Sequence, residues 1–422
     1  MKTSKKYNVA VMIIIEMIMV FFFSVTLNEV PPLITTISAD TGWSLGKCGQ
    51  LTSIVFFLCG AGSFVGSPIM DKFGTKKTAL IALGLAVAGH VVGWLGGANY
   101  TLQYIGKFLY GCGWGIFFLV PGSVIAFWLP LEKRALFNGI RCTCDILGSG
   151  MAYYIILPIF HGLNDNWQGT FGVFGIVFAV IFCAYLFLLP TNEAELAEMA
   201  QKKDAKARGE KGSSAGIIKA AKSKQVWIIL IALIGPQWIY NCFTTYVPSF
   251  LELERGYTAE AASNLTGIMS IAGMVAGVFI GSVSTIVGRR SVMTWPMILL
   301  MVIGGFGMAF TSSTALVIVF SIFIGFGLTG FMTAYTTIPG ELPGADNDFY
   351  AGAVAIIYGI AFMLTYITPV LYQAILDSGR SQSIALAINT IPGIISLIAA
   401  FFIMETGPKG KYQQSLKANK QA

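Results

Sequence analysis

Twelve stretches of this chain are each apolar over about the length that a helix needs to cross a bilayer. They cover residues 8–29, 47–70, 78–98, 102–128, 136–158, 170–190, 225–251, 263–285, 291–311, 314–336, 350–376 and 383–404. A transmembrane helix needs about 20 predominantly apolar residues. Only 11% of the 422 residues are charged, whereas soluble proteins carry about 25%. The sequence therefore predicts an all-α membrane protein with twelve transmembrane helices.

A polar stretch divides these helices into two sets of six. We expect residues 1–190 to form an N-terminal six-helix bundle, 191–224 a cytoplasmic linker, and 225–422 a C-terminal six-helix bundle with a short cytoplasmic tail. The linker contains EAELAEMAQKKDAKARGEKGSS, a composition typical of a surface helix followed by a flexible tether.

The basic residues indicate the orientation of the helices. If the N-terminus is cytoplasmic, 22 of the 27 lysine and arginine residues fall in cytoplasmic segments, and the outer connections hold Lys47, Arg255 and Arg380. Basic residues are enriched in cytoplasmic loops. Both termini are therefore expected in the cytoplasm, and the net charge of +7 is explained by topology without a nucleic-acid partner.

The two halves carry the same landmarks at one offset. Gly74 in the loop after the second apolar stretch corresponds to Gly288, which lies 214 residues later. The same offset carries Gly-Cys-Gly at 111–113 onto Gly-Phe-Gly at 325–327. The halves are thus predicted to be copies with the same membrane orientation, an arrangement found in transporters whose substrate binds between the halves.

Three motifs carry a resemblance to a known family. The loop DKFGTKK at 71–77, the sequence KFLYGCG at 107–113 and the outer loop NDNWQGTF at 164–171 together resemble signatures of the major facilitator superfamily. This resemblance implies a secondary transporter that works by alternating access. The chain departs from the pattern at Ser67 and Thr285, and its helix-5 sequence GSGMAYY lacks the Gly-Pro signature of the drug/proton antiporters.

The resemblance also implies a set of gating residues. In the family, the loop acid ties the halves together when the cytoplasmic side is closed, which assigns that role to Asp71. A carboxylate near a helix N-terminus is stabilising by about 0.3–1 kcal/mol. The alternative for the loop bases is that they only mark the cytoplasmic side. The predicted gating set is Asp71, Lys72, Gly74, Lys107, Arg289 and Arg290.

Four charged residues lie inside the apolar stretches, away from their end residues: Glu16, Lys107, Arg141 and Asp145. Intramembrane charges are rare and usually functional. Arg141 and Asp145 are four residues apart, so they share one helix face. Two interpretations remain open: a structural ion pair, or a substrate-anchoring Arg141 with proton coupling at Glu16 and Asp145.

The second half contributes neutral polar side chains. Gln237, Tyr240 and Asn241 follow a Gly-Pro pair at 235–236 in the seventh stretch, and Tyr358 lies in the eleventh. A proline inside a membrane helix frees backbone carbonyls. We therefore expect these four residues to contact the substrate together with Arg141.

The predicted function is transport of a small organic anion, a carboxylate, coupled to protons or by exchange. The alternatives are proton symport of a neutral metabolite and efflux of a drug or metabolite. We expect no enzymatic activity, cofactor or metal site, because no clustered nucleophile, ligand spacing or nucleotide-binding loop is present. The expected setting is the inner cell membrane, as a multi-pass monomer.

Overall fold

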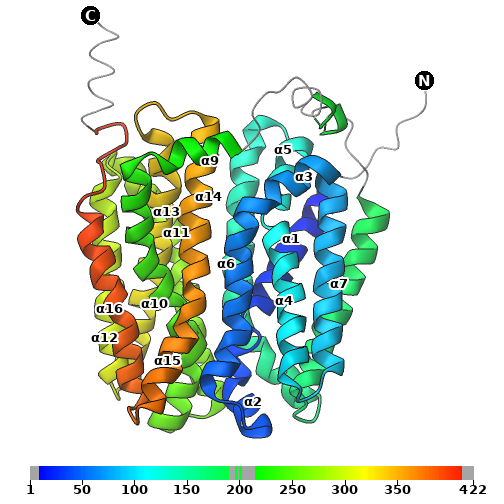
Figure 1. Cartoon of the computed structure of the whole chain (residues 1–422), viewed down its shortest axis with the longest axis vertical. Helices are drawn as coiled ribbons and strands as arrows, with labels where there is room; N and C mark the ends of the chain where they lie inside the picture. Colours follow the sequence, from blue (N-terminus) through cyan, green and yellow to red (C-terminus); the bar gives the residue numbers. More distant parts are fainter. Residues whose placement is uncertain (1–8, 190–194, 198, 202–213, 411–422) are drawn as a thin grey trace, which may run out of the picture.

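The computed structural model describes residues 9–189, 195–197, 199–201 and 214–410. Within these residues the chain is helical and contains no strand. Figure 1 shows two side-by-side groups of long helices, one from the first half of the chain and one from the second. Most of the predicted linker and the ends of both termini lie outside the described residues.

The first group comprises α1 (Val9–Leu27), η1 (Pro31–Leu33), α2 (Ile34–Thr41), α3 (Leu45–Leu95), α4 (Tyr100–Phe117), α5 (Val120–Trp128), α6 (Leu131–Gly162) and α7 (Trp167–Leu188). The short helix α9 (Ser214–Ala221) leads into the second group. This group comprises α10 (Lys224–Arg255), α11 (Ala259–Val287), η2 (Ser291–Met293), α12 (Thr294–Phe310), α13 (Thr314–Glu341), α14 (Asn347–Leu364), η3 (Thr365–Ile367), α15 (Thr368–Asp377) and α16 (Gln382–Ala400).

Eleven helices of the described part are long and apolar enough to cross a membrane, where the sequence predicted twelve. The difference arises in α3, which spans 51 residues and contains two predicted segments, 47–70 and 78–98. Its backbone breaks at Gly74, where φ is 74° and ψ is 167°. The chain reverses there (Figure 1), because glycine adopts this conformation without a Cβ clash.

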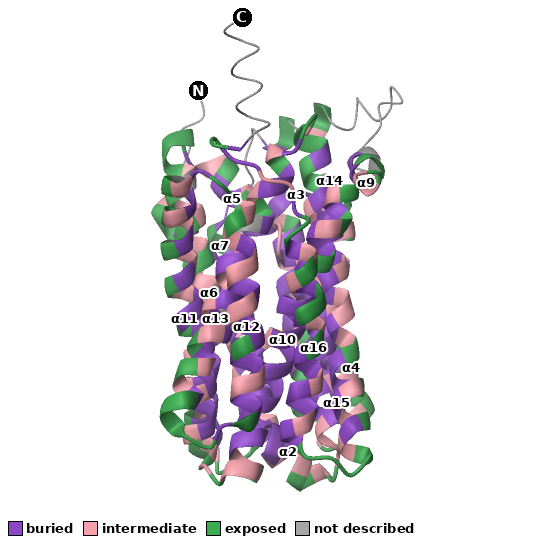
Figure 2. Cartoon of the chain, turned by 90° about the vertical axis from the view of Figure 1, so that its left-hand side faces the viewer, coloured by how far each residue is buried: buried purple, intermediate pink, exposed green. Residues whose placement is uncertain are grey.

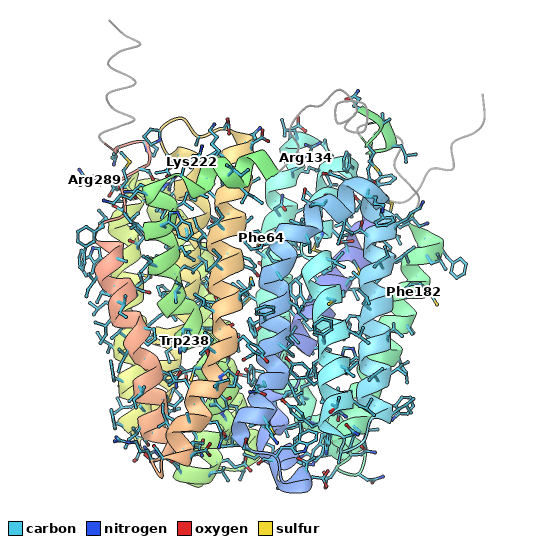
Figure 3. The ribbon with its side chains drawn as sticks, viewed as in Figure 1. Phe64, Arg134, Phe182, Lys222, Trp238 and Arg289 are labelled. Carbon is cyan, nitrogen blue, oxygen red and sulfur yellow. The ribbon has the colours of Figure 1, made fainter. Side chains whose placement is uncertain are left out.

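The two ends of the bundle differ in character. We call the end that carries Gly74, α9 and Gly288 the linker end, and the end that carries α2 the far end. Figure 3 shows Arg134, Lys222 and Arg289 together at the linker end, while Phe64 lies between the two groups of helices. The bases that the sequence assigned to one side of the membrane therefore gather at one end of the molecule.

Polar residues start the helices at the far end. Asn99 accepts a hydrogen bond from Leu102 N at 3.2 Å at the start of α4, and Asn166 accepts one from Gly169 N at 2.8 Å at the start of α7. Such caps satisfy backbone N–H groups that the first helical turn leaves without partners. Figure 2 shows that buried residues line the inside of the bundle.

The contacts between the groups repeat with the internal symmetry. The first group meets the second where α3 packs on α14 and where α6 packs on α11. The 214-residue offset carries the start of α3, Leu45, onto the start of α11, Ala259. The two contacts are therefore copies of each other, as the repeat predicts.

Glycines let neighbouring helices approach closely in both copies. A Cβ on Gly113 of α4 would meet Ala82 O at 2.6 Å, and one on Gly327 of α13 would meet Met297 O at 2.5 Å. Small residues at such positions allow close packing of membrane helices. The paired Gly-x-Gly motifs thus hold α4 and α13 against their neighbours.

Candidate functional site

Hydrogen bonds join the two groups of helices from the far end to the middle of the bundle. Thr35 donates to Glu252 Oε2 at 2.7 Å, and the hydroxyls of Tyr104 and Tyr366 lie 2.8 Å apart. Further pairs between the groups are Gly46–Gln373, Ser53–Asn241, Tyr153–Thr244, Cys59–Tyr358 and Ser63–Ala355. The far end is therefore closed in this structure.

A charged cluster lies where α1 packs on α6. Glu16 of α1 is fully buried, accepts a hydrogen bond from the Tyr185 hydroxyl at 3.3 Å, and leaves its Oε1 without a partner. Arg141 and Asp145 belong to α6, which packs on α1, and the Arg141 guanidinium lies within electrostatic range of both the Glu16 and the Asp145 carboxyl groups. The structure thus brings together Glu16, Arg141 and Asp145.

Arg141 does not form the ion pair that its spacing allows. Among the described residues, no carboxylate oxygen lies within the 4.0 Å limit of an ion pair with its guanidinium. Its Nη2 donates to Cys142 Sγ at 3.5 Å, and its buried Nε has no hydrogen-bond partner. An arginine fork with an unused buried donor is suited to a planar anion.

Asp145 is held by α1. Ser24 Oγ lies within hydrogen-bonding distance of Asp145 Oδ1 and 3.0 Å from Val20 O. One turn further along α6, Ser149 accepts a hydrogen bond from Asn28 Nδ2 at 2.7 Å. Side chains of α1 and of the residue directly after it therefore fix the polar face of α6.

The polar face continues into the second group of helices. The Tyr240 hydroxyl of α10 lies 3.0 Å from Ser270 Oγ of α11, and Ser149 is among its hydrogen-bonding neighbours. This continuity places Tyr240 on the same polar path as the α6 residues.

The other predicted contacts of the second half are spread over separate places. Gln237 is buried with its Oε1 unpartnered, and Asn241 accepts a hydrogen bond from Ser53 Oγ at 3.3 Å. Tyr358 lies 3.4 Å from Cys59 Sγ and stacks on Phe362 at a centroid distance of 3.9 Å. Asn241 and Tyr358 thus link the two halves, while Gln237 offers an unused acceptor.

The loop motif of the first half packs against the start of the linker. Glu195 accepts a hydrogen bond from Thr75 N, directly after the break at Gly74. Lys72 Nζ lies 5.1 Å from the Phe73 ring centroid. Asp71 lines a cavity of about 580 Å³ beside Arg134. These predicted gating residues therefore share the linker end of the first half.

The equivalent loop of the second half is held by charged partners. Arg290 pairs with Glu341 at 3.2 Å, and its backbone N–H donates to Glu405 Oε1 at 2.7 Å. Ser291 donates to Glu405 Oε2 at 2.6 Å. Arg289 is exposed at the linker end (Figure 3). In both halves, a glutamate from the segment after the sixth predicted helix binds the backbone of this loop.

Lys107 lies in a sealed charged cluster, separate from the linker-end loops. It pairs with Glu29, and His90 Nε2 lies 3.2 Å from the same carboxylate. Glu29 and His90 are 1% and 3% exposed, and the Lys107 ammonium lies 4.1 Å from the Phe171 ring centroid. The sequence analysis did not single out Glu29, because this residue stands at the end of an apolar stretch. Lys107 in the middle of a membrane helix was the signal that an acidic partner had to lie nearby.

The sequence was also compared with known proteins. The sequence profile of the Major Facilitator Superfamily matches residues 13–366, with a second match over 254–421. The chain belongs to the Major Facilitator Superfamily. This membership agrees with the membrane-spanning helices and the repeated halves, and it makes the protein a multi-pass membrane transporter.

Two curated transporters are similar to this chain in sequence. One is a probable sulfoacetate transporter of Cupriavidus necator, 23% identical over 274 residues, which cover 63% of this chain and 62% of the relative. The other is a hexuronate transporter of Bacillus subtilis, 23% identical over 342 residues, which cover 80% and 72%. The match therefore spans less than two thirds of the sulfoacetate transporter.

The fold of this chain also matches solved structures. The crystal structure of a D-xylose-proton symporter aligns with a TM-score of 0.71 at 17% identity, covering 95% of this chain and 98% of that one. At this level of identity the similarity establishes the transporter fold and leaves the substrate to the side chains of this chain.

Proposed function

We propose that this protein moves a small organic anion, a carboxylate, across the membrane by alternating access. The observation that carries the proposal is Arg141 of α6, a half-buried residue whose guanidinium has no carboxylate in ion-pair range and whose buried Nε has no hydrogen-bond partner. A buried polar group without a partner is costly. A carboxylate substrate would supply that partner, and the two similar transporters carry anions by name.

Asp145 is the proposed proton carrier, with Glu16 beside it. Ser24 has a single hydroxyl hydrogen, yet both Val20 O and Asp145 Oδ1 lie within its reach. An ionised Asp145 would compete with the carbonyl for that hydrogen, whereas a protonated Asp145 supplies its own. Protonation also removes a negative charge that would compete with the substrate for Arg141, so substrate and proton favour each other's binding.

The contacts in the second half are proposed to complete the site. Tyr240 continues the polar face of α6, and Gln237 offers a buried, unpartnered oxygen. Asn241 and Tyr358 hold α10 and α14 against α3. We assign these four residues to substrate contact and to closure around the substrate.

Gating is proposed at the linker end, which we place in the cytoplasm. Asp71, Lys72 and Gly74 form the loop of the first half, and Arg289 and Arg290 form its copy. Both loops are held by a glutamate, so movement of either half at this end must carry the following segment with it. Lys107 is proposed to hold α1 and α4 together during this movement.

Two alternative functions remain proposals, because the polar face of α6 could also bind other substrates. Proton symport of a neutral metabolite would use Asp145 and Glu16 without Arg141. Efflux of a drug or metabolite would use the aromatic side chains around Tyr358. The proposed setting is the inner cell membrane, with the protein as a monomer.

A thermal-shift screen of the purified protein tests the proposal. Carboxylates, sugars, amino acids and cationic drugs are each added at pH 5.5 and 7.5, because a ligand that binds the folded state raises its stability. Stabilisation by carboxylates that is lost in Arg141→Gln and kept in Arg380→Gln, an exposed arginine, supports the proposal. Stabilisation by neutral or cationic compounds that is indifferent to Arg141→Gln contradicts it.

A further inference from the structure

A histidine bridges the two halves at the far end. His161 lies in the last turn of α6, where its Nδ1 is 2.7 Å from Asp165 Oδ1 and its Nε2 is 3.1 Å from Glu260 Oε1. Asp165 follows α6 in the first half, whereas Glu260 lies in the first turn of α11 in the second half. The imidazole therefore joins the same two helices whose packing forms one of the contacts between the halves.

The number of N–H donors that the His161 imidazole needs determines its charge in this bridge. A neutral imidazole donates one hydrogen bond, and its second nitrogen carries a lone pair. Ionised carboxylates only accept hydrogen bonds. Both nitrogens of His161 face carboxylate oxygens, so the two-sided bridge needs a protonated imidazole. Loss of that proton would set a lone pair against either Asp165 or Glu260.

The surroundings of His161 are acidic. The same far-end cavity is lined by Asp40 of α2, whose Oδ2 accepts a hydrogen bond from Trp167 Nε1 at 2.8 Å. Asp40 of α2 and Asp165 of the loop after α6 are the acidic groups that line this cavity, and α7 presents Trp167 and Gln168 there. Glu260 of α11 faces His161 Nε2 from the second half. No described His, Cys, Asp and Glu side chains are grouped closely enough to hold a metal ion.

The turn after α6 positions the Asp165 carboxylate next to His161. Asn164 and Asp165 have φ values of 55° and 60°, a conformation that residues other than glycine adopt at a cost and that asparagine and aspartate tolerate best. Hydrogen bonds from Asp165 N to Phe160 O at 3.1 Å and from Asn164 N to His161 O at 3.2 Å hold this turn. This turn therefore holds the Asp165 carboxylate next to His161 Nδ1 within the first half, independently of Glu260 in the second half.

We propose that His161 is a proton-operated latch on the far end of the transporter. When protonated, it ties α6 to α11 through Glu260 and favours the conformation in which the far end is closed. When deprotonated, it releases Glu260 and the far end opens more readily. Acidification on the far side therefore shifts the protein toward the closed far end, independently of which substrate it carries.

The size of the effect follows from exposure. The His161, Asp165 and Glu260 side chains are 49%, 66% and 54% exposed, so solvent screens the bridge. Exposed ion pairs change equilibria by about two- to fivefold. The latch therefore biases the opening of the far end and does not lock it.

Spin-label distances across the far end test the latch without substrate. Cysteines replace Ala98 and Ser312, two exposed positions that lie 214 residues apart in the equivalent loops, in a background without the native cysteines. Distances are measured in nanodiscs at pH 5.5 and 8. We expect the closed-to-open ratio to fall about two- to fivefold on going to pH 8.

Three variants make the result decisive. His161→Gln and Glu260→Gln should remove the pH-dependent change, while Asp377→Asn, an exposed acid at the far end of the same half as Glu260, should keep it. An unchanged pH response in His161→Gln, or no response in the parent protein, overturns the latch. Because no substrate is added, neither outcome depends on the identity of the cargo.

Discussion

Glu29 and Lys107 form an ion pair that is sealed inside the first half, with His90 against the same carboxylate. The pair ties the segment after α1 to α4, and an aromatic ring covers its ammonium group. Breaking a buried pair leaves one uncompensated charge, which costs about 3–5 kcal/mol.

Lys107→Met should therefore lower the stability of the detergent-solubilised protein by about 3–5 kcal/mol. Glu29→Gln together with Lys107→Met should recover much of this loss, because neither charge is then left buried. Thermal unfolding measures both, and Lys47→Met, at an exposed lysine of the far end, is the control. A Lys107→Met protein as stable as the parent would show that the pair does not hold α4.

The break in α3 should depend on glycine. Gly74 has a φ of 74°, and a Cβ there would lie 3.1 Å from Met199 Sδ. Gly74→Ala should destabilise the protein by about 1 kcal/mol or more. Gly139→Ala in α6 is the matched control, since its Cβ would meet nothing within 4 Å. Equal thermal stability of the two variants would contradict this account of the break.

The packing of α9 against α14 should not change with pH near neutrality. Lys219 Nζ lies 2.5 Å from Asp346 Oδ2, and this hydrogen bond lowers the pKa of the Asp346 carboxyl below its ordinary value. A lowered pKa means that the pair stabilises docking above the ordinary aspartate pKa and is lost only as the pH falls through the lowered value.

Hydrogen exchange measures this docking. Protection of residues 214–221, corrected for the intrinsic effect of pH on exchange, should be the same at pH 5.5 and 8. Lys219→Gln should reduce it at both values. A loss of protection in the parent protein between these two pH values would assign the docking to some other titrating group.

Asp145→Asn should separate proton coupling from substrate binding. The amide keeps the size of the side chain and its contact with Ser24 but cannot exchange a proton. In proteoliposomes, we expect accumulation driven by a pH gradient to disappear while exchange of labelled for unlabelled substrate continues. Retained pH-driven accumulation would exclude Asp145 as the proton carrier, and Glu16→Gln is the next variant in that case.

Much of the fold follows from the sequence because membrane helices need long apolar runs and the repeat fixes their pairing. The offset between Gly74 and Gly288 predicts that α3 and α11 occupy equivalent places, and their contacts with α14 and α6 agree. The single long helix α3 was not predicted, since the chain stays helical on both sides of Gly74. The short helix α2 was also missed, because eight residues carry no clear period.

The side-chain partners were harder to predict. The spacing of Arg141 and Asp145 allows an ion pair, but Ser24 of α1 holds the aspartate instead. Glu29, His90 and Lys107 are distant in sequence and meet only because α3 and α4 pack against the segment after α1. Spacing along one helix shows which residues share a face, whereas the choice of partner depends on the neighbouring helix.

The measurement that tests the central claim most directly is solute counterflow in proteoliposomes loaded with an unlabelled carboxylate that stabilises the protein. Counterflow needs substrate binding and alternating access but no proton gradient. The account predicts transient accumulation of the labelled carboxylate by the parent protein and by Arg380→Gln, and its loss in Arg141→Gln. Undiminished counterflow in Arg141→Gln would contradict the role of this arginine as the anion anchor.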